Sequence, residues 1–191
     1  MGIIVSLSGS KAVGKTTLIN GLKRTIPKLQ IREGFRQTNT GYSLNIEQEY
    51  YMNQRWYIRR EIEEYQLFRN NNNPTLLLRG PEDVEFYTLH YPKTKGFKWN
   101  VEANLQKELK ELRRCRSDFI IYLDAPEEII LQRKINDDTK PRKNMKNWMQ
   151  NWQPYIESYM KKIEYTYVFD TEKKDVEEVL KEVTKWLKER L

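Results

Sequence analysis

The amino-acid sequence predicts an α/β protein in which about five parallel strands form a central sheet with helices on both faces. Short apolar runs alternate along the chain with longer stretches whose apolar residues recur at helical spacing. This alternation is typical of parallel sheets, because each crossover between parallel strands usually returns through a helix. A glycine-containing turn between the first strand and the first helix is the second observation. Ligands of such sheets bind beyond the carboxyl ends of the strands.

The predicted strands share short apolar or β-branched runs bounded by polar turns. They span residues 3–7, 29–33, 75–78, 119–123 and 165–169. The polar run that ends at Pro74 is a loop. The predicted helices share apolar residues at three- and four-residue spacing. They span residues 15–25, 46–68, 101–112, a stretch beginning at Pro126, 148–163 with a break near Pro154, and 176–187.

Composition limits the class of protein. The 191 residues contain 34 Lys and Arg against 27 Asp and Glu, a net charge of +7, which attracts nucleic acid or a phosphorylated small molecule. The single cysteine, Cys115, excludes an internal disulfide and favours a reducing, cytoplasmic setting. The longest apolar runs fall far short of the roughly 20 residues of a membrane-spanning helix. We expect one domain without a secretory signal, a membrane segment or a cysteine-built metal site.

Residues 9–16 read GSKAVGKT and match the phosphate-binding pattern GxxxxGK(S/T) between a strand and a helix. Gly9 and Gly14 allow backbone conformations that turn N–H groups toward phosphate oxygens. Lys15 supplies a positive charge to the β- and γ-phosphates, and Thr16 offers a hydroxyl to Mg²⁺. The motif predicts a three-layer P-loop NTPase fold. The expected nucleotide contacts are Gly9, Ser10, Lys11, Ala12, Val13, Gly14, Lys15, Thr16 and Thr17.

Nearly the whole chain resembles the P-loop nucleoside and nucleoside-monophosphate kinases, particularly the deoxynucleoside kinase and thymidylate kinase branch. Besides the glycine turn, the resemblance rests on residues 76–83, 120–134 and 167–171. It implies ATP and Mg²⁺ as cofactors, a nucleoside or nucleotide as phosphate acceptor, and a lid over about 136–147. It also implies that Asp170 lies beside the adenine, and that a homodimer forms, as is frequent in these kinases.

The third strand departs from the family's pattern. Its members usually place Asp or Glu immediately before the Arg, and this chain has Leu78 before Arg79. That acidic side chain normally helps to hold Mg²⁺ through water. Glu82 and Asp83 in the following turn are the candidates to replace it.

The resemblance implies catalytic roles for four further side chains. Glu33 would accept the proton of the attacking hydroxyl or contact the sugar, and the alternative is a solvated loop carboxylate. Arg79 would clamp the acceptor or the transferred phosphoryl group, and the alternative is a structural ion pair. Arg133 and Arg142, beside and within the basic lid, would neutralise charge on closure. Arg133 could instead stack on adenine.

The aromatic and amide-rich start of the 46–68 helix corresponds to the helix that lines the acceptor site in these kinases. Gln54 would read a base edge and Tyr57 would stack on it, although aromatic residues at helical spacing are more often core. His90 is expected to be a packing residue rather than a catalyst.

The leading hypothesis is ATP-dependent phosphoryl transfer to a nucleoside or nucleoside monophosphate, without nucleic acid as a partner. The chain has no NKxD guanine-reading motif, which argues against a GTPase. One alternative is a kinase for another small hydroxyl compound. The other is a non-catalytic or weakly hydrolytic nucleotide-binding module that touches nucleic acid through the basic face at 140–146.

Overall fold

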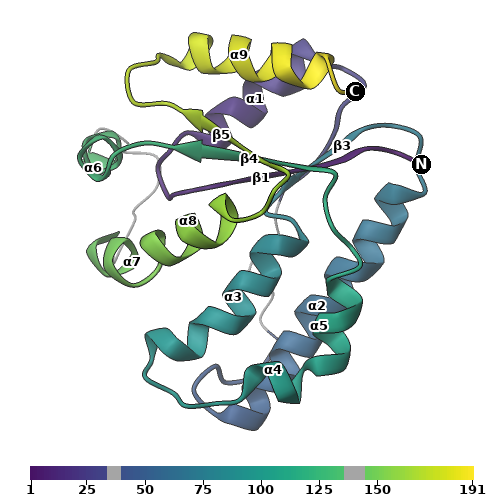
Figure 1. Ribbon diagram of the computed structural model, residues 1–191, viewed down its shortest axis with the longest axis vertical. Coiled ribbons are helices and arrows are strands. Elements are labelled where there is room, and N and C mark those ends of the chain that lie inside the picture. Colours follow the sequence, from purple (N-terminus) through teal and green to yellow (C-terminus); the bar gives the residue numbers. More distant parts are fainter. Residues whose placement is uncertain (34–39, 136–144) are drawn as a thin grey trace.

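A computed structural model of the chain describes residues 1–33, 40–135 and 145–191. Five parallel strands form one sheet in the order β2-β3-β1-β4-β5, which confirms the predicted architecture (Figure 1). The strands are β1 (Ile4–Gly9), β2 (Gln30–Arg32), β3 (Thr75–Leu78), β4 (Phe119–Asp124) and β5 (Thr166–Asp170). All residues of β1 are buried, as expected for the central strand of a sheet covered on both faces.

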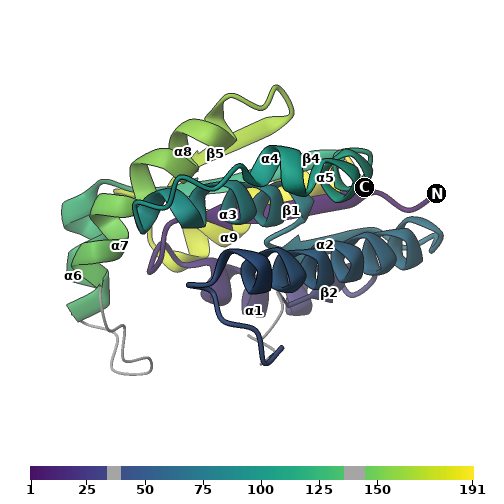
Figure 2. The same ribbon diagram turned by 90° about the horizontal axis from the view of Figure 1, so that it is seen from below.

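Helices cover the sheet on two sides and complete three layers. The helices are α1 (Lys15–Thr25), α2 (Glu47–Arg69), α3 (Pro81–Thr94), α4 (Val101–Asn104), α5 (Gln106–Leu112), α6 (Glu127–Ile135), α7 (Met145–Asn151), α8 (Gln153–Lys161) and α9 (Val176–Lys188). α1 and α9 pack together on one face, and α2, α3, α5 and α8 lie on the other (Figures 1 and 2). Within the described ranges, no helix has the length and apolar character needed to cross a membrane.

Helix α3 was not predicted from the sequence. It begins with Pro81 after an extended Gly80, and Glu82 and Asp83 stand in its first turn, where carboxylates favour the helix dipole. Two predicted helices are each divided in two. The 101–112 stretch is interrupted at Leu105, between α4 and α5, and the break expected near Pro154 lies at Trp152, between α7 and α8.

The alternation of side chains along β1 decides what faces the functional end of the sheet. Val5 and Leu7 pack in the core cluster that includes the apolar face of α1. Ser6 and Ser8 point to the opposite face, where they meet α3. Because Leu78 of β3 is in register with Leu7, its side chain lies on the α1 face of the sheet.

Candidate active site

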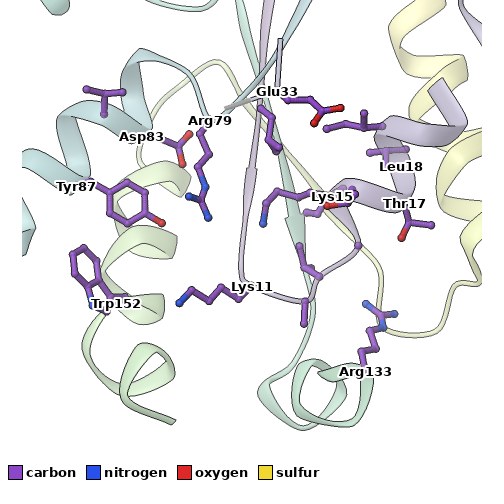
Figure 3. A pocket seen from close by; sticks show the side chains of 18 of the residues that line it. Lys11, Lys15, Thr17, Leu18, Glu33, Arg79, Asp83, Tyr87, Arg133 and Trp152 are labelled. Atoms are coloured by element: carbon purple, nitrogen blue, oxygen red, sulfur yellow. The ribbon is translucent and has the colours of Figure 1, made fainter. Parts of the chain in front are cut away.

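A cavity of about 1500 Å³ opens beyond the carboxyl ends of β1, β3 and β4 (Figure 3). Residues 11–20 and the segment between β5 and α9 line one half of it. Aromatic and amide side chains of α2 and α3 line the other half, together with Trp152. The position agrees with the general rule for parallel sheets, and it joins a loop suited to phosphate with a chamber suited to a planar organic group.

The glycine turn has the backbone conformation that its sequence predicts. Gly9 and Gly14 have φ values of 134° and 107°, which disfavour any side chain. A Cβ atom at Gly9 would stand 2.4 Å from the carbonyl oxygen of Leu123. Lys15 Nζ donates to the carbonyl oxygens of Gly9 and Ser10 at 2.8 and 2.6 Å. The ammonium group is therefore held against the turn, where a phosphate can take over its hydrogen bonds.

Three cationic side chains, Lys11, Lys15 and Arg79, reach into the space between the glycine turn and α3 (Figure 3). Lys11 Nζ lies 5.3 Å from the ring centroid of Trp148, and the Arg79 guanidinium carbon lies 5.5 Å from that of Tyr87. Arg79 forms no ion pair with the described part of the chain. Positive charge gathered on aromatic walls suits a polyanion such as a triphosphate.

A buried ion pair positions the backbone of Arg79. Arg32 donates to both carboxylate oxygens of Glu61, at 2.9 and 2.6 Å, and their side chains are 8% and 0% exposed. The same guanidinium donates to the Arg79 carbonyl oxygen at 3.3 Å. Arg79 has a φ of 64°, unusual for a residue with a side chain. The pair thus ties β2 and α2 to the turn that aims Arg79.

Glu33 lines the cavity just after β2, where the sequence predicted it. Its side chain is 63% exposed and accepts a hydrogen bond from Lys23 Nζ of α1 at 2.9 Å. In this arrangement its carboxylate is paired at the rim of the cavity.

The two candidate replacements for the missing acid at position 78 have different surroundings. Both carboxylate oxygens of Glu82 accept hydrogen bonds, from Ser117, Ser6 and Tyr165. Asp83 lines the cavity, and its Oδ1 accepts from Ser8 Oγ at 2.9 Å. Burial raises the pKa of Asp83 to about 6, although Arg79 and Ser8 oppose the shift. Of these two carboxylates, therefore, only that of Asp83 is available to a molecule in the cavity.

The half of the cavity between α2 and α3 brings together Gln54 and Tyr57, predicted to bind the acceptor, with residues that the sequence did not identify. Gln54 Oε1 accepts from Thr88 Oγ1 at 2.8 Å, which fixes the orientation of the amide. Tyr50 is buried and stacks on Tyr91 with centroids 5.5 Å apart. This half is thus an aromatic chamber with an oriented amide at its wall.

His90 confirms the packing interpretation. Its ring is buried, lies stacked on Phe86 with centroids 5.0 Å apart, and bonds the Asn151 carbonyl oxygen through Nε2 at 2.8 Å. Burial lowers the pKa of His90.

The opposite end of the cavity lies between α6 and the start of α9. Arg133 donates to Thr171 Oγ1 at 2.8 Å and to the Thr171 carbonyl oxygen. Asp170 does not line the cavity, and its carboxylate accepts from the Glu172 amide at 2.9 Å. The lining here comes instead from Thr171, Lys174 and the first turn of α9. Arg142 and most of the predicted lid lie outside the described residues.

Metal-ligating groups are sparse at the site. In residues 1–33, 40–135 and 145–191, no group of three or more His, Cys, Asp or Glu side chains could hold an ion. Thr16 lines the cavity with a hydroxyl group, a hard oxygen donor. This donor set fits a Mg²⁺ ion that arrives bound to phosphates, because Mg²⁺ keeps several waters and needs few protein ligands.

Solved structures share this architecture over nearly the whole chain. The amino-acid sequence itself matches no protein-family model and no curated protein sequence. Deoxyadenosine kinase from M. mycoides with bound dATP superposes with a TM-score of 0.74 at 13% identity, over 97% of this chain and 100% of that one. Thymidylate kinase from Candida albicans gives 0.65 at 14% identity, over 98% and 92%.

The fold is that of the P-loop nucleoside and nucleotide kinases. A second M. mycoides deoxyadenosine kinase structure, with bound dCTP, gives a TM-score of 0.68 at 14% identity. The likeness confirms at the level of the fold the resemblance that the sequence motifs indicate.

The sequence reading missed the contribution of α3 to the site. Asp83, Val84, Tyr87 and Tyr91 line the cavity and come from this one helix. Asp83, Tyr87 and Tyr91 recur every four residues directly after Gly80 and Pro81, and this is the signal that could have identified the helix.

Proposed function

We propose that the protein transfers the terminal phosphoryl group of ATP to a nucleoside or a nucleoside monophosphate. The observation that carries this proposal is the single cavity that joins the glycine turn to the aromatic chamber of α2 and α3. A hydrolase needs only the first half. The superposition on a deoxyadenosine kinase and a thymidylate kinase supports the same activity.

The donor half has the groups that a Mg²⁺-bound triphosphate requires. Amide groups of residues 9–17 and the Lys15 ammonium would hold the phosphates, as a strand–turn–helix of this kind does generally. The Thr16 hydroxyl would hold the metal, which when bound neutralises phosphate charge. Thr171 and Arg133, beside the first turn of α9, would contact the base, with Asp170 directly before Thr171 in the chain.

Positive charge at the junction of the two halves would act on the phosphoryl group during transfer. Charge on that group spreads over its outer oxygens, and a planar guanidinium can contact two of them. Arg79 has this position between the glycine turn and α3. We propose the same role for Arg142, which lies outside the described residues, on a lid over about 136–147 that excludes water. Arg133, expected from the sequence to share this role, bonds Thr171 at the opposite end of the cavity, so we assign it to the base instead.

The acceptor half suits a nucleoside base. Tyr57 and Tyr87 supply faces for stacking, and the Gln54 amide, oriented by Thr88, supplies a donor for a base edge. Glu33 at the rim would orient the acceptor after exchanging its contact with Lys23. We also propose a homodimer and a cytoplasmic location, which suits the single free cysteine.

A coupled assay of ADP release tests the proposed function. The purified protein would be mixed with MgATP and a panel of nucleosides, monophosphates and unrelated alcohols, with product mass as a second readout. At least one nucleoside or monophosphate should raise turnover well above the ATPase background and gain about 80 Da. ATP turnover that no nucleoside or nucleotide changes would refute the proposal. Product from an unrelated alcohol alone would make the protein a different small-molecule kinase.

A further inference from the structure

Asp83 carries a buried carboxylate oxygen that contacts no hydrogen-bond donor in the described part of the chain. The residue is 2% exposed, Oδ1 accepts from Ser8 Oγ, and Oδ2 is unpartnered. Such an oxygen is costly to bury, and unsatisfied buried polar atoms in native proteins often mark functional positions. Asp83 lines the cavity and its side chain points toward Arg79 (Figure 3), so a donor that enters the cavity beside Arg79 is the group placed to satisfy Oδ2.

Asp83 stands where the two halves of the cavity meet. It lies in the first turn of α3, one turn before Tyr87 of the acceptor chamber (Figure 3). Its hydrogen bond to Ser8, which directly precedes Gly9, connects it to the phosphate-binding turn. A hydroxyl of an acceptor that occupies the α2–α3 half and faces the glycine turn would therefore lie on the side of this carboxylate.

Asp83 lies on the opposite face of the sheet from position 78, where the resembled kinases have an acidic residue before the arginine. Leu78, which occupies that position, lies on the α1 face of the sheet, on the side of Thr16. Asp83 bonds Ser8 on the α3 face, the side of the acceptor chamber. Its placement thus favours a contact with the acceptor over a contact with a metal ion near Thr16.

We propose that Asp83 is the general base of the reaction and that the acceptor is consequently a hydroxyl group of a nucleoside. The inference rests on the proposed function. The acceptor oxygen forms a bond to the terminal phosphorus of ATP while its proton passes to Asp83 Oδ2. The bond between that phosphorus and the bridging oxygen breaks, and ADP leaves with the bond's electron pair. At neutral pH a monophosphate acceptor is mainly a dianion with no proton to lose, and its charge is repelled by a carboxylate at this place.

The groups that surround Asp83 make its ionisation informative. Electrostatic interactions or hydrogen bonds link the ionisation of Asp83 to six neighbouring groups: Arg79, Lys15, Ser8, Glu82, Tyr87 and Tyr122. Burial dominates and raises its pKa to about 6. A base with this pKa is ionised at neutral pH, and it can still accept a proton effectively.

Asp83→Asn tests the assignment, with Glu63→Gln, an exposed charge change on α2, as the matched control. Rates with a nucleoside would be measured between about pH 5 and 8, and affinity for a non-hydrolysable ATP analogue measured in parallel. Asp83→Asn should lower kcat by about 10²–10⁴-fold and leave analogue affinity within a few-fold. The acid limb of kcat/KM near pH 6, present in the parent and in Glu63→Gln, should disappear.

Several outcomes would overturn the base assignment. A kcat within a few-fold of the parent with the acid limb intact would do so, as would rescue of Asp83→Asn by high Mg²⁺, which would indicate a metal ligand. Transfer to monophosphates but not to nucleosides would do the same. If Asp83→Asn does not fold, Asp83→Glu replaces it, and an acid limb unmoved from that of the parent counts against the proposal. A parent enzyme that phosphorylates nothing refutes the proposed function instead.

Discussion

The buried carboxylate of Asp83 should reduce the stability of the fold at neutral pH, and its removal should restore that stability. Its pKa is raised from an ordinary value of 3.8 to about 6. For an acid with a raised pKa, the folded state binds the proton more tightly than the unfolded state. Stability is therefore lost as pH rises from about 4 to about 6, and no further loss follows above that range.

The size of the effect follows from the shift. About two pKa units at 1.36 kcal/mol each correspond to roughly 3 kcal/mol. Asp83→Asn keeps an oxygen for Ser8 but adds a buried amide donor, which costs about the same at every pH. The difference in unfolding free energy between Asp83→Asn and the parent should therefore move by up to about 3 kcal/mol in favour of the variant between about pH 4 and 7.5.

Urea unfolding of both proteins at several pH values measures this difference. For a chain of this length, each kcal/mol of difference in unfolding free energy corresponds to a shift of about 2–4 °C in melting temperature. Because only the change with pH enters, the constant cost of the amide cancels. A difference in unfolding free energy that does not change between about pH 4 and 7.5 would refute the reasoning, because it would show that burial does not raise the pKa of Asp83.

Three further substitutions test other parts of the site. Lys15→Ala should lower phosphoryl transfer by about 10²–10³-fold with an unchanged circular dichroism spectrum, since the side chain serves charge rather than packing; unchanged turnover excludes its phosphate role. Arg142→Ala should lower kcat more than ATP affinity if the lid acts on the transition state, and loss of ATP affinity alone would remove it from catalysis. Glu61→Gln should lower the unfolding free energy by about 3 kcal/mol because buried Arg32 loses the carboxylate that accepts two of its hydrogen bonds and keeps the longer contact with Glu64 at 3.5 Å, and an unchanged urea midpoint contradicts this.

The centre of the sheet was predictable because β1, β3 and β4 are almost entirely buried and read as continuous apolar runs. β3 and α1 have the bounds that the sequence indicates. α3 was not predicted because it has no solvent-exposed polar face opposite an apolar one, so its sequence lacks a clear apolar stripe. Glu82, Glu85 and Thr88 are buried along with Phe86. A helix surrounded by the protein loses the amphipathic pattern on which sequence reading depends.

The site was predictable where chemistry is local in sequence, as in the glycine turn. It was not predictable where a partner distant in the chain decides the role of a side chain. Glu33 comes at the expected place, yet its contact with Lys23 depends on how α1 packs. Asp83 and Glu82 are distinguished by the partners that each one meets, from segments far away in the sequence: Ser8 for Asp83, and Ser6, Ser117 and Tyr165 for Glu82.

The paired contacts between β1 and α3 fix the distance between the two halves of the cavity. Ser6 meets Glu82 and Ser8 meets Asp83, so two successive side chains of the helix are fastened to alternate residues of the strand. These two hydrogen bonds hold the end of β1 and the first turn of α3 together between the two halves of the cavity. Under the proposed function, a change in acceptor preference would come from side chains of α2, which takes no part in these contacts, while the separation between phosphate donor and acceptor would stay constant.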